Sequence, residues 1–111
     1  MTFDEAVKET LAFRDNRDWA QFHNPKDLAI SISLEAAELL ETFQWSGVDL
    51  EVSEKAEHAS EELADVVIYC IYMADVLGID IANTICNKIK ANDAKYPAEK
   101  SRGNARKYTE L

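Results

Sequence analysis

Two pairs of acidic residues stand inside stretches of sequence that are otherwise apolar. The pairs are Glu35 with Glu38, and Glu62 with Asp65. Side chains three residues apart lie about one turn apart on the same face of an α-helix. Four carboxylates that point inward from two helices cannot all stay ionised in a low-dielectric interior without a cation. The spacing therefore predicts that these four residues are the ligands of a metal ion.

The type of ligand narrows the choice of metal. Ligand sets made only of oxygen atoms favour hard cations, so Mg²⁺ is expected and Mn²⁺ is the second choice. Di-iron helical bundles use Glu-x-x-His pairs, and neither His23 nor His58 lies three residues after a glutamate. Zinc is not expected either, because the chain has no Cys or His cluster with ligand spacing.

Aromatic residues follow the acidic pairs at helical spacing. Trp45 lies seven residues after Glu38, and Tyr69 lies seven residues after Glu62. Residues seven apart on a helix return to nearly the same angle, about 10 Å further along the axis. A cleft with carboxylates at one end and flat rings at the other would suit a nucleotide, with its phosphates on the metal and its base on the rings.

A polar stripe near the C-terminus fits the same picture. Lys88, Asn92 and Lys95 share one helical face, and we expect them to neutralise phosphate charge that the metal leaves uncovered. Each of these features also has a plainer explanation, because acidic pairs and lysines are common on solvated helix faces and aromatic rings are common in cores. A non-enzymatic, all-α interaction protein is therefore the alternative.

The elements that would position these residues are all helical. Start signals are the capping box of Thr2 with Glu5, Asn24 before a proline, Ser53 and Asp80. No alternating strand pattern with glycine-rich hairpin turns occurs. We predict an all-α, four-helix bundle subunit with a C-terminal tail after Tyr96. The four helices are expected at about 2–22, 25–45, 53–77 and 80–95.

Composition limits the architecture and the partners. A chain of 111 residues is expected to form a single domain over 1–111. Its net charge of −9 argues against a uniformly basic surface for nucleic acid. The two cysteines have no CxxC spacing, and the sequence shows no signal-peptide pattern. It also has no apolar run near the length of a membrane span. These features favour a cytoplasmic protein. The second and third helices are apolar on more than one face, which predicts a homodimer or homotetramer.

The pattern Glu-x-x-Glu, then 23 residues, then Glu-x-x-Asp resembles the signature of the all-α nucleoside triphosphate pyrophosphohydrolases, the MazG-like superfamily. Other segments resemble its dCTP pyrophosphatase branch, and together they extend the likeness from about Phe13 to Leu111. These segments are 17–25, 43–45, 61–69, 95–97, 101–103 and 107–109.

The resemblance implies a function and a set of roles. The family cleaves nucleoside triphosphates between the α and β phosphates, giving a nucleoside monophosphate and pyrophosphate. Its acidic quartet binds catalytic magnesium, and Asn92 corresponds to an asparagine near the sugar and phosphates. Its members are dimers or dimers of dimers whose active sites borrow from neighbouring subunits. The residues that match its base pocket are Trp19, His23, Trp45 and Tyr69.

One departure from the family concerns the base. The mammalian enzymes carry a histidine on the first helix where this chain has Thr10. The chemistry would be unaffected, but a pyrophosphohydrolase with broad rather than cytosine-selective specificity becomes an alternative. For Arg102 and Lys107 we favour a role in holding the tail over contact with phosphate.

Overall fold

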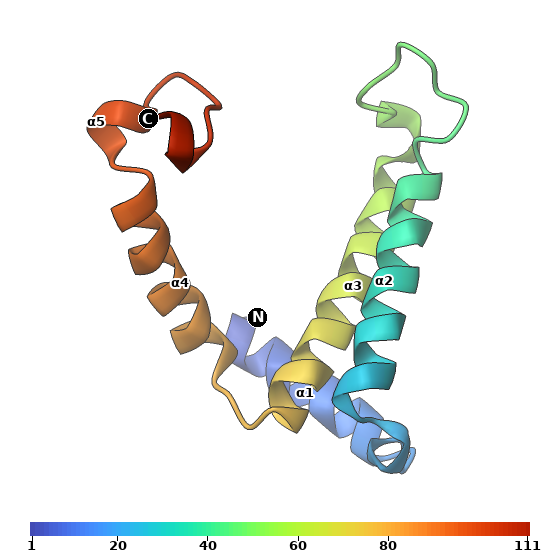
Figure 1. The fold of residues 1–111 in the computed structure, drawn as a ribbon. Coiled ribbons are helices and arrows are strands. Elements are labelled where there is room, and N and C mark those ends of the chain that lie inside the picture. The colour runs from blue at the N-terminus through green and yellow to red at the C-terminus, as the bar shows by residue number, and fades with distance from the viewer. The chain divides into compact units, whose positions relative to one another are not determined.

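A computed structural model describes all residues, 1–111, and contains helices but no strands. The predicted all-α class is therefore confirmed (Figure 1). No helix combines the length and the apolar character that crossing a membrane requires. The α-helices are α1 Phe3–Asp15, α2 Pro25–Glu41, α3 Ala56–Val76, α4 Ile81–Lys95 and α5 Ala98–Ser101. Short 3₁₀ helices occur at Ala20–Phe22, Ser53–Lys55 and Tyr108–Glu110.

The chain consists of two compact units, Met1–Gly78 and Ile79–Leu111. In the first unit, α2 and α3 lie side by side and run in opposite directions, and α1 packs on α3 (Figure 1). The second unit holds α4, α5 and the C-terminal residues. The single domain over 1–111 and the packing of α4 into a four-helix bundle stay predictions.

Three of the four predicted helix starts are confirmed by their capping bonds, whereas the start predicted at Ser53 is wrong, because α3 begins at Ala56 without a side-chain cap. The Glu5 backbone N–H donates to Thr2 Oγ1 at 3.1 Å, and the Thr2 N–H donates to Glu5 Oε2 at 2.9 Å. Asn24 caps α2 by accepting from the Asp27 N–H at 2.9 Å. Asp80 caps α4 by accepting from the N–H of Asn83 at 3.0 Å. These local bonds satisfy N–H groups that have no partner within the helix.

The first helix ends at Asp15, so the predicted extent to residue 22 is wrong. The Trp19 N–H donates to the Arg14 carbonyl at 3.2 Å, and the Asp18 N–H donates to the Asp15 carbonyl at 3.1 Å. Asp18 takes a left-handed conformation, with φ of 53°. This is the Schellman arrangement that ends many helices, usually with glycine at the left-handed position. The reversal brings the Trp19 ring edge-on to Phe13, with centroids 5.7 Å apart.

The second and third helices are also shorter than predicted. The α2 helix ends at Glu41, and the residues up to Trp45 form turns, with Trp45 itself at φ of 67°. Trp45 therefore does not continue the helical stripe of Glu38, and the seven-residue spacing argument fails for this ring. The α3 helix begins at Ala56, after a 3₁₀ turn. It ends before Gly78, whose φ of 68° is the left-handed conformation that glycine adopts easily.

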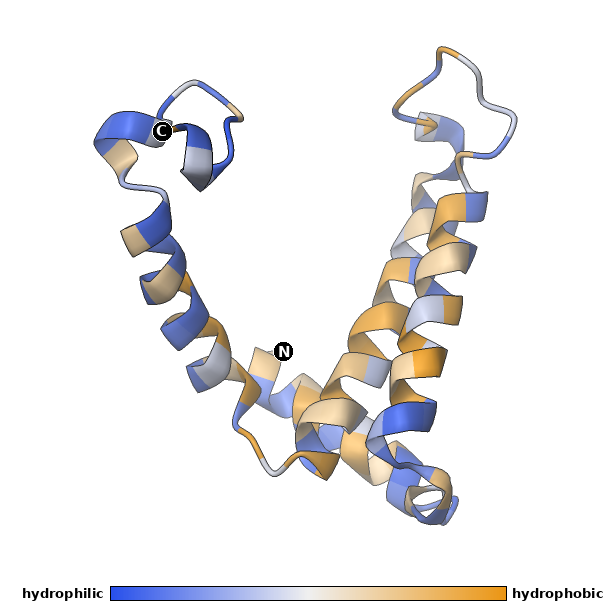
Figure 2. Ribbon diagram, in the orientation of Figure 1, coloured by the Kyte–Doolittle hydropathy of each residue, from blue (hydrophilic) through white to orange (hydrophobic).

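The hydrophobic core of the first unit is small. Its buried apolar side chains are Leu28, Val52, Ile71, Tyr72 and Ala74. Many apolar side chains on α2 and α3 are instead exposed, among them Leu34 at 60% and Leu40 at 70%. Figure 2 shows hydrophobic residues recurring along both of these helices. This distribution matches the apolar excess of the second and third helices in the sequence.

Candidate active site

The antiparallel pair of α2 and α3 brings the two acidic pairs together. Glu35, Glu38, Glu62 and Asp65 each offer a carboxylate oxygen, and these four atoms lie within 4.8 Å of one another. The pairs come from facing turns of helices that are separated in the sequence by a 14-residue connection, 42–55. Sequence spacing alone predicted this meeting of four side chains. A cluster of this kind can bind a metal ion.

Burial and mutual repulsion make it unfavourable for the carboxylates of the cluster to be ionised without a cation. Burial, a hydrogen bond with Glu38 and the negative charges of Glu38, Asp65 and Glu62 together raise the pKa of Glu35 to about 7. Burial also raises the pKa of Glu62, and so do a hydrogen bond with Glu38 and the negative charge of Glu38. The Oε2 atoms of Glu35 and Glu62 are buried and have no hydrogen-bond partner. Closely spaced carboxylates with buried oxygens that accept no hydrogen bond fit a hard divalent cation, which would bind those oxygens and balance their charge.

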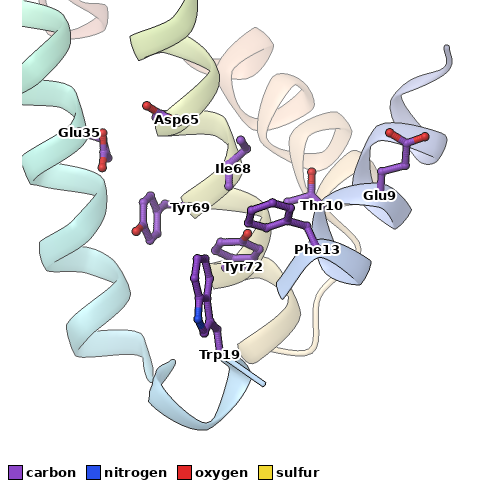
Figure 3. Close-up of a pocket in the computed structure, with 9 residues that line it drawn as sticks. All are labelled: Glu9, Thr10, Phe13, Trp19, Glu35, Asp65, Ile68, Tyr69 and Tyr72. Atoms are coloured by element: carbon purple, nitrogen blue, oxygen red, sulfur yellow. The ribbon is translucent and has the colours of Figure 1, made fainter. Parts of the chain in front are cut away.

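A pocket of about 410 Å³ opens beside the acidic cluster. Figure 3 shows Glu35 and Asp65 at one end of it and the rings of Trp19, Tyr72 and Phe13 at the other. Tyr69 lies between the two groups. The remaining lining residues are Glu9, Thr10 and Ile68. The pocket thus has an acidic end and an aromatic end, and of its rings only Tyr69 was predicted from the seven-residue spacing.

The predicted base-binding residues differ in where they lie. Trp19 and Tyr69 line the pocket. His23 lies behind the lining, with its ring 4.9 Å from that of Tyr72 between centroids, and its Nδ1 atom is buried without a partner. Burial lowers the pKa of His23, and the positive charge of Arg14 lowers it further. Trp45 is outside the pocket of this chain and is 92% exposed.

Sequence reasoning missed Tyr72, which is 3% exposed and forms part of the aromatic end. Its ring meets Tyr69 edge-on, at 5.7 Å between centroids. The signal was present, because Tyr72 follows Asp65 by seven residues, the same spacing that pointed to Tyr69. Phe13 was missed because it belongs to the first helix, which carries none of the acidic residues of the cluster.

The polar stripe lies in the second unit. Lys88, Asn92 and Lys95 are exposed residues of α4. The Nζ atom of Lys95 lies 5.1 Å from the centre of the Tyr108 ring, and Tyr108 in turn meets Tyr96 edge-on at 5.9 Å. The tail is thereby held against the end of α4. A role of the stripe in binding phosphate stays a prediction.

Comparison with known proteins decides the family. The model of the MazG-like family matches residues 30–111. The chain belongs to the MazG-like family. The predicted membership is confirmed, and the match includes both acidic pairs, from α2 and α3.

Individual members of the family are similar over nearly the whole chain. dCTP pyrophosphatase 1 of Rattus norvegicus is 40% identical over 116 residues, which span 99% of this chain and 68% of that protein. The Homo sapiens protein of the same name is 39% identical over the same shares. A crystal structure of a pyrophosphatase from Archaeoglobus fulgidus superposes with a TM-score of 0.75 at 43% identity, covering 85% of this chain and 91% of that one. The predicted enzyme class, a hydrolase, is thereby confirmed.

Proposed function

We propose that this MazG-like protein is a Mg²⁺-dependent pyrophosphohydrolase of deoxynucleoside triphosphates that prefers dCTP or a modified dCTP. It cleaves between the α and β phosphates, giving a deoxynucleoside monophosphate and pyrophosphate, and so removes unwanted nucleotides from the pool. The observation that carries the proposal is the pocket itself, which has carboxylates at one end and aromatic rings at the other. The similarity to proteins named dCTP pyrophosphatase 1 supports the choice of base.

The four clustered carboxylates would hold the metal ion. Mg²⁺, when bound, supplies positive charge that polarises phosphate oxygens and makes water a stronger nucleophile. The chain's own contribution is to hold the phosphates in line with the water and to take up a proton. A carboxylate of the cluster suits the second task, and the candidates are Glu35, which lines the pocket, and Glu38.

The aromatic end would hold the base. Trp19 and Tyr69 offer ring surface to a nucleobase, and the almost fully buried Tyr72 supports them. Stacking on aromatic rings contributes about 1–3 kcal/mol per base. His23 supports this wall from behind by packing on Tyr72. Because the rings are held by contacts within the chain, they need little rearrangement when the base enters.

A homodimer or homotetramer would complete the site. The exposed Leu34 and Leu40 on α2 supply apolar surface for contact between subunits. Trp45 is exposed in the single chain, which is consistent with a ring that closes the pocket of a neighbouring subunit. Lys88, Asn92 and Lys95 would bind phosphates in this assembly. We further propose a cytoplasmic location, which the two free cysteines, Cys70 and Cys86, support.

A broader substrate range is the second candidate. Thr10 lines the pocket at the aromatic end, and its hydroxyl donates to the Ala6 carbonyl at 2.8 Å. Its only hydroxyl hydrogen is therefore already used, so Thr10 cannot donate to a base while this bond stands. A pocket that lacks a donor at this point discriminates less strongly between bases.

The test is pyrophosphate release from the four standard dNTPs and 5-methyl-dCTP, with and without Mg²⁺. The proposal expects Mg²⁺-dependent release that strongly favours the cytosine nucleotides. Even release across the bases would keep the chemistry and replace the preference for dCTP with a general clearing role. If no nucleotide yields pyrophosphate, the alternative of an interaction protein gains and the proposed activity fails.

A further inference from the structure

One face of α3 carries a row of five side chains that differ in chemistry along the helix. In chain order the row is His58, Glu62, Asp65, Tyr69 and Tyr72. Their spacings of four, three, four and three residues keep them on one side of the helix. At a rise of about 1.5 Å per residue, Tyr72 lies about 10 Å from Asp65 along the axis, and His58 lies about 10 Å beyond Asp65 on the other side.

His58 stands at the rim of the acidic cluster, on the side away from the rings. Its Nε2 atom lies 3.6 Å from Oε1 of Glu62, and its side chain is 55% exposed, against 16% for Glu62. The other oxygen of Glu62, Oε2, is buried and without a partner. The imidazole therefore contacts the outer oxygen of Glu62 and leaves the inner one free. It remains accessible to a molecule that extends out of the cluster.

His58 is also the only basic side chain within Ala56–Val76, although the exposed Lys55 stands just before it as the N-cap residue of α3. The residues near it on the same helix include Glu57, Glu61 and Glu62. A polyanionic substrate would meet mainly repulsion at this end of the site if His58 offered no N–H donor. Hydrogen bonds between a donor and a charged phosphate oxygen are among the stronger ones that proteins make.

We propose that His58 binds the terminal phosphates of the substrate and then the pyrophosphate that leaves. The inference rests on the proposed function, because that function sets the direction of the substrate along α3. With the base against Tyr69 and Tyr72 and the α and β phosphates at the carboxylates, the triphosphate continues toward the first turns of α3. His58 is the donor that it meets there.

The role of His58 is to bind charge and involves no proton transfer. In hydrolysis the water oxygen forms a bond to the α-phosphorus and gives up a proton to a carboxylate of the acidic cluster, and the bond from this phosphorus to the bridging oxygen breaks. The electron pair stays on that oxygen, which becomes part of pyrophosphate. The Nε2–H group of His58 donates to oxygens of this leaving group and keeps its hydrogen throughout. The contact also strengthens as negative charge builds up on the leaving group.

The test compares ligands with and without terminal phosphates. Affinities of the wild type and of His58→Ala are measured by calorimetry with Mg²⁺ present, for α,β-methylene-dCTP and for dCMP. The expected result is a loss of about tenfold in affinity for the methylene analogue and no change for dCMP. His58→Gln keeps a side-chain N–H donor and is expected to recover part of the loss. With dCTP as substrate, His58→Ala is expected to lose a similar factor in kcat/KM.

The controls separate this inference from a structural effect and from the proposed function. Lys26→Ala removes an exposed cation near the start of α2 and is expected to bind both ligands as the wild type does. If His58→Ala weakens the binding of both ligands equally, His58 acts only through the fold or the metal, and the inference is wrong. Unchanged binding of the methylene analogue by His58→Ala would also overturn the inference. Both results leave the proposed function intact. A wild type that hydrolyses no dNTP would overturn both together.

Discussion

Arg14 and Asp75 form an ion pair that ties α1 to α3 behind the aromatic end of the pocket. Arg14 Nη1 lies 2.6 Å from Asp75 Oδ2, and Arg14 Nε lies 2.8 Å from Asp15 Oδ1. The Arg14 residue is only 7% exposed, and its guanidinium carbon lies 6.0 Å from the centre of the Tyr72 ring. Its carbonyl also accepts the Trp19 N–H. One residue thus helps to place two of the rings that would hold the base.

Replacement of Arg14 is expected to weaken both the fold and base binding. Arg14→Met keeps the length of the side chain but leaves Asp75 unpaired, and we expect a loss of about 2 kcal/mol in the free energy of unfolding. The loss stays moderate because the Asp75 side chain is 43% exposed and can be hydrated. Urea denaturation measures the change, with Lys8→Met on the exposed side of α1 as the control. For Arg14→Met, the KM for dCTP should rise by a larger factor than the kcat falls. A free energy of unfolding equal to that of the control variant would contradict the structural role of Arg14.

Removal of one charge from the acidic cluster is expected to abolish turnover while stabilising the metal-free protein. Asp65→Asn and Glu38→Gln keep the shape of each side chain, so turnover should fall by about 100-fold or more without loss of the fold. The melting temperature in EDTA should rise, because repulsion within the cluster decreases. Glu41→Gln, on the exposed last turn of α2, is the matched control. Near-normal activity in either cluster variant would mean that the assignment of metal ligands is wrong.

The raised pKa of Glu35 predicts a particular dependence of stability on pH. The folded state binds the proton of Glu35 more tightly than the unfolded state does, since its pKa rises from 4.5 to about 7. The stabilisation from this proton is complete below about pH 4.5 and is lost as the pH rises toward 7. In EDTA, the melting temperature should therefore fall over this range, and Glu35→Gln should flatten the fall. A metal-free wild type that gains stability between pH 5 and 7 would contradict the pKa assignment.

Trp45 provides a test of the assembled site. Because its ring is exposed and outside the pocket of its own chain, Trp45→Ala should cost little stability, within about 0.5 kcal/mol for a surface position. If a neighbouring subunit uses the ring to cover the base, KM should rise and the choice between bases should loosen. Val48→Ala, in the same exposed connection, serves as the control. An unchanged KM across all nucleotides would remove Trp45 from the pocket.

Local hydrogen-bonding rules explain why the helix starts and the acidic cluster could be predicted. Thr2, Asn24 and Asp80 act on backbone groups three residues away, and carboxylates three apart share a face wherever a helix forms. The end of α1 could not be predicted in this way. It depends on Asp18 in a left-handed conformation, where a glycine would have given a clear signal.

Tertiary packing explains the other differences from the sequence-based predictions. Tyr72 belongs to an apolar run that indicates core in the sequence, and only the packing of α1 on α3 turns it into a pocket wall. Trp45 follows Glu38 at the correct interval, yet α2 ends before the interval is complete. The phosphate-binding role of the α4 stripe depends on contacts beyond a single helix, which no spacing in the sequence specifies.

The most direct test of the central claim is to identify the products formed from dCTP by the wild type and by Asp65→Asn, each with Mg²⁺ and with EDTA. The account predicts dCMP and pyrophosphate in equal amounts, formed only by the wild type and only with Mg²⁺. Release of single phosphate with dCDP, or equal pyrophosphate release by Asp65→Asn, would contradict the claim that the four carboxylates of α2 and α3 direct cleavage between the α and β phosphates.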